Sequence, residues 1–190
     1  AMFAAASGAI ALMHLAFPFP LLPFLEFDMA EIPDAIAFMI LGPRAGIISA
    51  SIHAMVLYIL GAFTVFSPLM KLFAELSMFA GIYAGFKIGK MNRHRKSIMA
   101  GLGSLMRVIV MLFVTLALYY VIMPSIYLPT AKLAMSIPGI TLTSPFEIAM
   151  LLVGLTSAFN LIAGLITIGV AFAVVKSITV AFPELMPVVY

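Results

Sequence analysis

The chain has 190 residues, of which 65% are hydrophobic and 9% are charged, and its mean hydropathy is +1.24. This composition excludes a water-soluble globular domain, which would expose large apolar patches and aggregate. The apolar stretches are continuous and lack the alternation of a membrane β-barrel, so we expect an all-α integral membrane protein with one membrane domain over residues 1–190. The chain has no cysteine, which excludes disulfides and thiolate chemistry.

Six apolar segments predict a six-helix transmembrane bundle, because a hydrocarbon core of about 30 Å needs about 20 helical residues. The first segment ends where Pro18, Pro20 and Pro23 prevent a helix from continuing. The second is short, and Pro33 suits its first turn. A proline-rich loop at 124–145 precedes the last segment. The predicted helices cover residues 2–17, 32–41, 44–66, 69–90, 97–123 and 146–181.

The distribution of basic residues predicts the topology. Half of the ten Lys and Arg residues fall in one short stretch after the fourth segment: Lys87, Lys90, Arg93, Arg95 and Lys96. The positive-inside rule places this loop in the cytoplasm of a cell-membrane protein, and the net charge of +3 thus reflects topology rather than nucleic-acid binding. Both termini are then cytoplasmic, while the 24–34 stretch and the 124–145 loop lie outside. Lys71 and Lys132 run against the rule, but five residues outweigh two.

An acidic stretch stands out in this nearly uncharged chain. Four of the seven acidic residues fall within nine positions: Glu26, Asp28, Glu31 and Asp34. They are either a solvated loop or the polar mouth of a membrane-embedded site.

Small residues recur at four-residue spacing in three of the segments. They are Ala5 and Ala9 in the first, Gly42, Gly46, Ala50 and Ala54 in the third, and Gly81, Gly85 and Gly89 in the fourth. Such stripes let helices approach closely in lipid. They serve either packing inside the bundle or docking of a partner membrane protein.

No catalytic constellation is evident. The three histidines, His14, His53 and His94, lie far apart and lack the spacing of a metalloenzyme motif. The GFKIGK sequence at 85–90 is a helix end entering the basic loop and not a phosphate-binding loop. The sequence therefore predicts no enzyme, no metal site, no cofactor and no ATPase within this chain.

Polar residues inside the apolar segments are better evidence for binding, because such groups are costly in a membrane. Glu75, Tyr119 and Asn160 all map to the outer half of their segments. Asn160 is either a ligand anchor or an interhelical hydrogen bond, and the tyrosines are either pocket residues or an interfacial aromatic belt. His53 is either functional or a satisfied buried imidazole. Together with the acidic stretch, they suit a pocket for a flat, uncharged, hydrogen-bonding ligand.

The stretch from Pro23 to Gly46 resembles the signature of the riboflavin-specific S component, the substrate-binding membrane subunit of energy-coupling factor (ECF) transporters. The matching positions are Phe24-Leu25, Asp28, Glu31-Ile32-Pro33 and Gly42-Pro43-Arg44-Ala45-Gly46. Weaker matches are Ala74-Glu75-Leu76 with Phe79-Ala80-Gly81, the Tyr119–Pro124 stretch, and Phe159-Asn160-Leu161-Ile162.

The resemblance implies a six-helix protein that captures riboflavin from outside, with the 24–34 loop as a lid over an outward-facing pocket. It also implies a membrane T component and two cytoplasmic ATPase subunits as partners. The partner-docking surface would include Ala5 and Ala9, with Gly46 and Ala50 as further candidates. The expected ligand-binding residues are Phe24, Leu25, Glu26, Phe27, Asp28, Glu75, Phe79, Tyr119 and Asn160.

Two positions depart from the family pattern. Where the family's sixth helix has a lysine after Asn-Leu-Ile, this chain has Ala163, and Leu118 stands where the family often has Asn. The ligand contacts must then differ, or the ligand is another small vitamin or precursor. A stand-alone membrane facilitator and an intramembrane enzyme are the alternatives from other classes.

Overall fold

The structure, a computed structural model, describes residues 1–61, 66–89, 93–126, 144–184 and 187–190. Most of the predicted 124–145 loop lies outside these residues. The described elements, in chain order, are α1 (Met2–Leu12), β1 (Ala16–Phe19), β2 (Leu22–Asp28), α2 (Glu31–Leu41), α3 (Pro43–Leu60), α4 (Ser67–Ile88), α5 (Arg95–Leu116), a π-helical turn η1 (Ala117–Ile122) and α7 (Pro145–Ala181).

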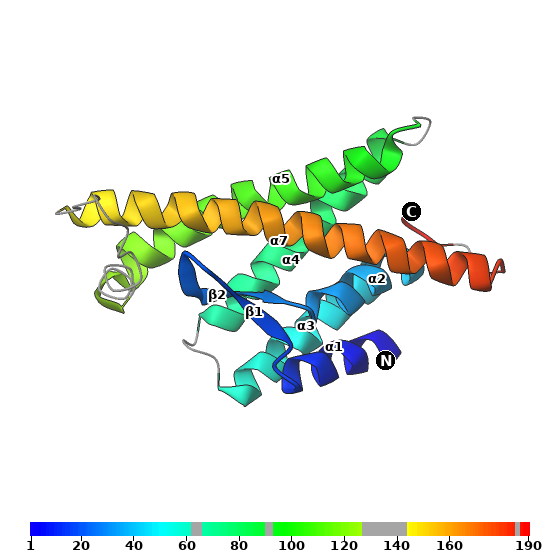
Figure 1. The fold of residues 1–190 in the computed structure, drawn as a ribbon, viewed down its shortest axis with the longest axis horizontal. Helices are drawn as coiled ribbons and strands as arrows, with labels where there is room; N and C mark the ends of the chain where they lie inside the picture. The colour runs from blue at the N-terminus through cyan, green and yellow to red at the C-terminus, as the bar shows by residue number, and fades with distance from the viewer. Residues whose placement is uncertain (62–65, 90–92, 127–143, 185–186) are drawn as a thin grey trace.

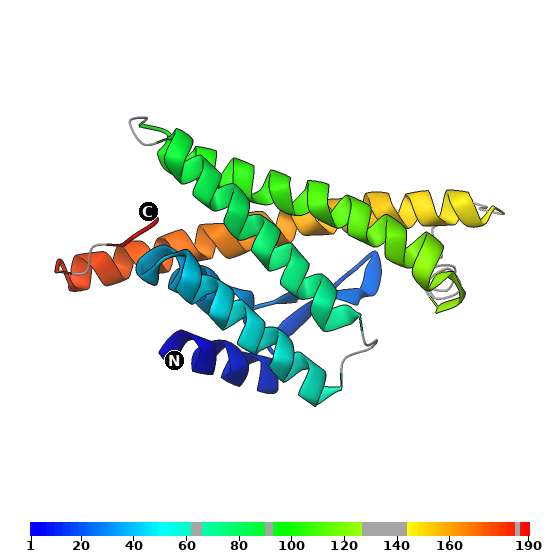
Figure 2. The ribbon, with the colours of Figure 1, turned by 180° about the vertical axis from the view of Figure 1, so that it is seen from behind.

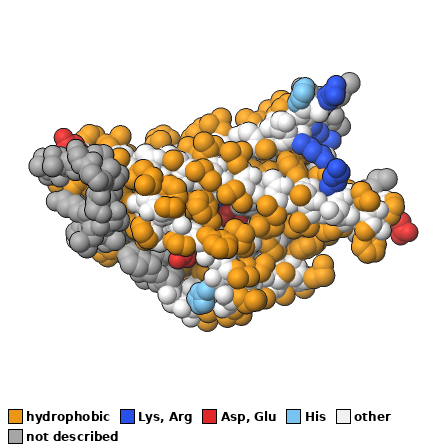
Figure 3. All heavy atoms as spheres, viewed as in Figure 1, with side chains coloured by type: hydrophobic (Ala, Val, Ile, Leu, Met, Phe, Trp, Pro, Cys, Tyr) orange, Lys and Arg blue, Asp and Glu red, His pale blue; other side chains and the backbone are white. Residues whose placement is uncertain are grey.

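The protein is a mostly helical, multi-pass membrane protein. Four of the described helices are long and apolar enough to cross a membrane: α3, α4, α5 continued by η1, and α7. α1 is apolar but shorter, and α2 has only 11 residues, so the predicted six spans are supported in part. Hydrophobic side chains cover most of the face in Figure 3, and Lys and Arg gather near the turn between α4 and α5.

The long helix α5 packs against both α4 and α7, while α1, α2, α3 and the two strands lie together on one side of these three helices (Figures 1 and 2). Both termini lie at the end of the molecule where α4 turns into α5 (Figure 1). The opposite ends of α4 and α5 therefore lie away from the basic residues and nearer the hairpin.

The predicted first helix is too long, because the chain forms a β-hairpin after Leu12. β1 and β2 pair antiparallel, with Ala16 opposite Asp28 and Phe17 opposite Phe27. Proline is tolerated here because each strand of a two-stranded sheet has a free edge. The all-α prediction therefore needs this correction, and the expected 24–34 loop is a strand followed by the first turn of α2.

The hairpin has an irregular strand register near its turn. Pro18 pairs with Glu26, but the next residue, Phe19, pairs with Leu22. The intervening residues Pro23, Phe24 and Leu25 have no counterpart on β1. Such a bulge re-aims side chains, and it frees this short segment from the alternating pattern of the ladder.

The glycines of the fourth segment let α4 and α5 approach at backbone distance. A Cβ atom at Gly81 would lie 2.2 Å from the carbonyl oxygen of Leu102, and one at Gly85 would lie 2.6 Å from the Cα of Met99. This stripe therefore serves packing inside the bundle.

Replacing Gly81 by Ala should destabilise the fold by about 1–3 kcal/mol, because the helices must separate to admit the methyl group. Gly101→Ala is the matched control, since nothing lies within 4 Å of a Cβ there. Alanine there should be neutral or stabilising by up to about 1 kcal/mol through helix propensity. Thermal unfolding of both variants in detergent measures this difference, and equal melting temperatures would contradict the close packing.

Candidate ligand-binding site

A cavity of about 440 Å³ lies between the hairpin and the ends of the long helices. Its walls come from β2, the first residue of α2, the end of α3, the start of α4, α5 with η1, and α7. The residues that carry the argument are Phe24, Asp28, Glu31, Lys71, Arg107, Tyr119, Phe159 and Asn160.

One part of the wall is aromatic. The ring of Phe24 meets the ring of Tyr119 edge-on at 6.4 Å between centroids, and Phe159 also lines the cavity. Tyr119 is buried and belongs to the π-helical turn η1, a distortion that often occurs at functional sites. Phe159 is held from behind by Phe27 at 4.8 Å and Phe19 at 5.6 Å.

The polar wall centres on a buried ion pair between α5 and α2. Arg107 Nη1 donates to Glu31 Oε2 at 2.6 Å, and Nη2 donates to Oε1 at 3.1 Å. Arg107 Nε donates to Asn160 Oδ1 at 3.0 Å, and Thr167 Oγ1 donates to Glu31 Oε2 at 3.3 Å. The guanidinium fork thus fixes helices α2, α5 and α7 relative to one another.

A second ion pair lies beside the first. Lys71 of α4 pairs with Asp28 at the end of β2, and its Nζ is 3.9 Å from Glu31 Oε1. Asp28 Oδ1 also accepts a hydrogen bond from the backbone N–H of Ala30 at 2.8 Å. Burial raises the pKa of Asp28, but the hydrogen bond from His53 and the charge of Lys71 outweigh it and hold that pKa well below its usual range. Asp28 is therefore a carboxylate at neutral pH.

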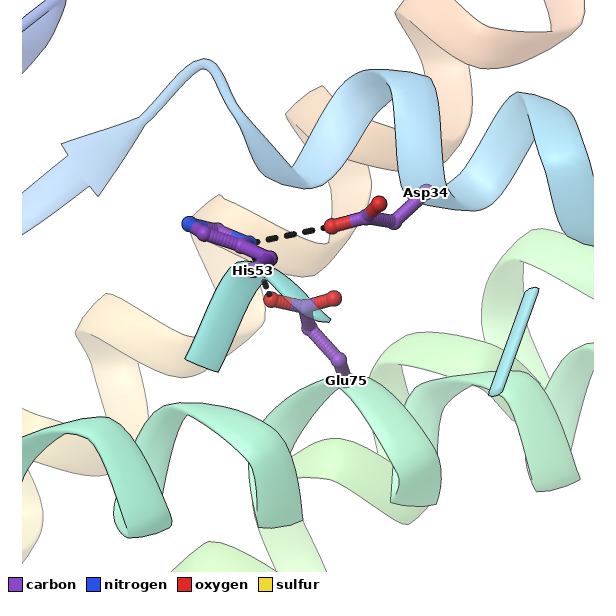
Figure 4. A group of neighbouring side chains, drawn as sticks. All are labelled: Asp34, His53 and Glu75. Carbon is purple, nitrogen blue, oxygen red and sulfur yellow. Dashed lines mark hydrogen bonds and ion pairs between the residues drawn. The ribbon is translucent and has the colours of Figure 1, made fainter. Parts of the chain in front are cut away.

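Behind this wall, His53 contacts three carboxylates. Its Nδ1 lies 3.0 Å from Asp34 Oδ2 and 3.2 Å from Glu75 Oε1, and its Nε2 lies 3.3 Å from Asp28 Oδ2. Figure 4 shows His53 of α3, Asp34 of α2 and Glu75 of α4 facing one another. His53 is fully buried, as the packing alternative requires, but it belongs to a charged cluster rather than to an apolar core.

Six of the nine predicted ligand residues line the cavity: Phe24, Leu25, Glu26, Asp28, Tyr119 and Asn160. The other three lie elsewhere. Phe27 packs behind Phe159, Glu75 lies in the cluster around His53, and Phe79 stacks on Phe38 at 4.6 Å in the core. Their predicted contact with ligand would need another conformation.

Of the four predicted docking residues, two are exposed and two are buried. Ala5 and Ala9 lie on the exposed face of α1. Gly46 and Ala50 are buried, and a Cβ at Gly46 would lie 2.5 Å from the Cβ of Phe38. In this structure the stripe on α3 packs against α2 and offers no surface to a partner.

Sequence reasoning missed Arg107 and underrated Lys71. Arg107 is the one basic residue within the 97–123 apolar segment, and an ionisable residue there is by default a functional candidate. In the sequence, Lys71 stands out only as an exception to the positive-inside rule, and nothing there indicates its pairing with Asp28. The burial of Glu31, against the alternative of a solvated loop, also follows from these two cations.

The two departures from the family pattern lie in an apolar cluster next to the cavity. Ala163 and Leu118 are both buried and pack in one cluster with Tyr119 and Phe159. The cation near Asn160 comes instead from Arg107 on α5.

No protein-family model and no curated protein matches the chain. A solved structure of the S component of a bacterial ECF transporter does match it, with a TM-score of 0.64 and 23% sequence identity. The match covers 94% of this chain and 91% of that one. The chain has the fold of an ECF S component. That protein is a component of a transporter.

Replacing Glu31 by Gln should destabilise the protein by about 3–5 kcal/mol, because it leaves Arg107 buried with no full charge partner. Unfolding in detergent measures this loss. Glu26→Gln is the control, since Glu26 is an exposed carboxylate of the same stretch and should change stability by less than about 0.5 kcal/mol.

Adding Arg107→Met to Glu31→Gln removes the stranded charge and should recover most of the loss. A double variant no more stable than Glu31→Gln alone would show that the ion pair is not the cause.

Proposed function

We propose that the protein is the substrate-binding S component of an ECF transporter and that its ligand is riboflavin or a close flavin. The observation that carries the proposal is the cavity between the hairpin and α7, in a chain that shares the S-component fold over nearly its whole length. A volume of about 440 Å³ is within the range of about 300–1,000 Å³ for sites that enclose small organic ligands.

The two kinds of wall suit the two halves of a flavin. The flat ring system would lie against Phe24, Tyr119 and Phe159, which offer aromatic surface in different orientations. The polar ring edge and the hydroxyl-bearing chain would reach Asn160, Thr156 and the paired charges. An apolar surface with a few polar anchors is the usual composition of such a site.

The charges of the cavity favour an uncharged ligand. Both cations that line it, Lys71 and Arg107, are already paired with Asp28 and Glu31. A phosphorylated ligand would have to displace a carboxylate or remain unpaired in a buried site, and both are costly. The site therefore favours riboflavin over its phosphate ester.

The topology follows from the placement of charge. The basic residues flank the turn from α4 to α5, whereas the cavity involves the start of α4 and the end of α5. If the basic turn is cytoplasmic, both termini are cytoplasmic and the cavity opens near the outer surface. Release to the inside would then need the T component and two ATPase subunits.

Riboflavin binding by the purified protein tests the ligand. The fluorescence of riboflavin should be quenched on saturable addition of protein in detergent, because flavin fluorescence falls when the ring stacks on aromatic side chains. Riboflavin 5′-phosphate should bind at least about tenfold more weakly, the equivalent of about 1.4 kcal/mol. If the protein binds thiamine or biotin but not riboflavin, the proposed S-component function stands and the proposed flavin ligand is wrong.

Phe24→Ala should weaken riboflavin binding by about tenfold or more, since an aromatic contact contributes about 0.5–1.5 kcal/mol beyond its buried area. Phe17→Ala is the matched control, because Phe17 lies in the same hairpin and is 61% exposed. Equal losses in the two variants would show that the effect comes from the hairpin and not from ring contact.

Replacing Ala5 and Ala9 together by Leu should abolish assembly with the T component and leave riboflavin affinity unchanged. Bulky side chains on the exposed face of α1 would prevent close helix approach. Co-purification with the T component and ATPases measures assembly. Ala6→Leu, at a neighbouring exposed position, is the control and should assemble normally. Normal assembly of the Ala5/Ala9 double variant would show that the docking surface lies elsewhere.

A further inference from the structure

Three donor atoms converge behind the ligand cavity. They are Asp34 Oδ2, His53 Nδ1 and Glu75 Oε1, they come from three helices, and all lie within 4.8 Å of one another (Figure 4). The two distances from Nδ1 are 3.0 and 3.2 Å. Ligands about 2.1 Å from one metal ion and about 90–110° apart around it are separated by about 3.0–3.4 Å. Both distances from His53 Nδ1 fall in this range, and the third pair, the oxygens of Asp34 and Glu75, lies within 4.8 Å and would close on a bound ion.

The surroundings orient these atoms as in a metal site. His53 Nε2 faces Asp28 Oδ2 at 3.3 Å, and a metal-binding imidazole usually directs its other nitrogen at a carboxylate. Ser49 Oγ donates to Asp34 Oδ1 at 2.5 Å, and Ser7 Oγ donates to Asp34 Oδ2 at 2.9 Å. These donors hold the carboxylate of Asp34 toward His53.

Two of the carboxyl groups beside His53 have no basic side chain of their own. Lys71 and Arg107 pair with Asp28 and Glu31, and no Lys or Arg among the described residues pairs with Asp34 or Glu75. Asp34 and Glu75 are both buried, and a cation placed between them and His53 would contact both.

An unsatisfied atom at the same place supports this reading independently. Glu75 is 1% exposed, and its Oε2 has no hydrogen-bond partner among the described residues. A buried carboxylate oxygen is normally hydrogen-bonded or bound to a metal. The carboxylate of Glu75 therefore has unused capacity beside His53.

We propose that Asp34, His53 and Glu75 bind one divalent first-row transition-metal ion. One imidazole nitrogen with two carboxylate oxygens suits Zn²⁺ and its neighbours better than Mg²⁺. The ion would tie α2, α3 and α4 together and, through Asp28, set the position of the hairpin. This site is separate from the ligand cavity and does not depend on the proposed transport function.

The test is calorimetric titration of the full-length protein in detergent, stripped of metal by a chelator and free of flavin. ZnCl₂ should bind at one equivalent per chain and raise the melting temperature, whereas MgCl₂ at the same concentration should do neither. Glu75→Gln and Asp34→Asn keep the side-chain shapes and should each weaken Zn²⁺ binding by about 100-fold, at least as much as the loss of an orienting partner.

Glu184→Gln is the control, because it removes an exposed carboxylate and should bind Zn²⁺ like the unaltered protein. Absence of one-equivalent Zn²⁺ binding in the unaltered protein would overturn the proposal. Unchanged binding in either ligand variant would assign the ion to surface histidines and overturn it as well. Flavin binding is measured separately, so either proposal can fail alone.

Discussion

The buried ion pair between Glu31 and Arg107 is the constraint on which the site depends. Arg107 lies in a span where an unpaired guanidinium would be very costly, so the first turn of α2 must meet it. Once Glu31 is fixed there, the chain just before it is also fixed. Asp28, three residues earlier, accepts from the backbone of Ala30 and meets Lys71. The pair therefore sets the position of β2, and with it the cavity wall.

A pair of this kind contributes specificity more than stability. The desolvation of two buried charges offsets most of their attraction, so an apolar replacement of similar volume often does as well. The value of the arginine lies in its geometry: its fork binds both oxygens of Glu31, and its third nitrogen binds Asn160. Three helices are thus held in one register around a pocket that needs polar groups at defined places.

The sequence predicts the long helices well, because continuous apolar runs of about 20 residues have few alternatives in a membrane. It fails at the hairpin. The prolines from Pro18 onward predict the end of the first helix too late, since α1 ends at Leu12. They also conceal the strands, because a proline-rich stretch is typical of a loop. The strand pairing of Ala16 with Asp28 and the bulge at Phe24 depend on packing against α7 and η1. Local pattern carries no information about that contact.

The stripes of small residues show the same limit. Four-residue spacing predicts close approach of two backbones but not which neighbour approaches. Gly81 meets Leu102 of α5, Gly46 meets Phe38 of α2, and Ala5 faces outward. Only the position of each helix in the bundle distinguishes them.

The acidic stretch separates into members with different environments, which explains why counting its charges misleads. Glu26 is exposed, Asp28 and Glu31 are neutralised by cations from α4 and α5, and Asp34 faces a histidine of α3. Each partner lies at least 15 residues away in sequence. Burial of an acidic residue is therefore decided by whether the fold delivers a positive group to it.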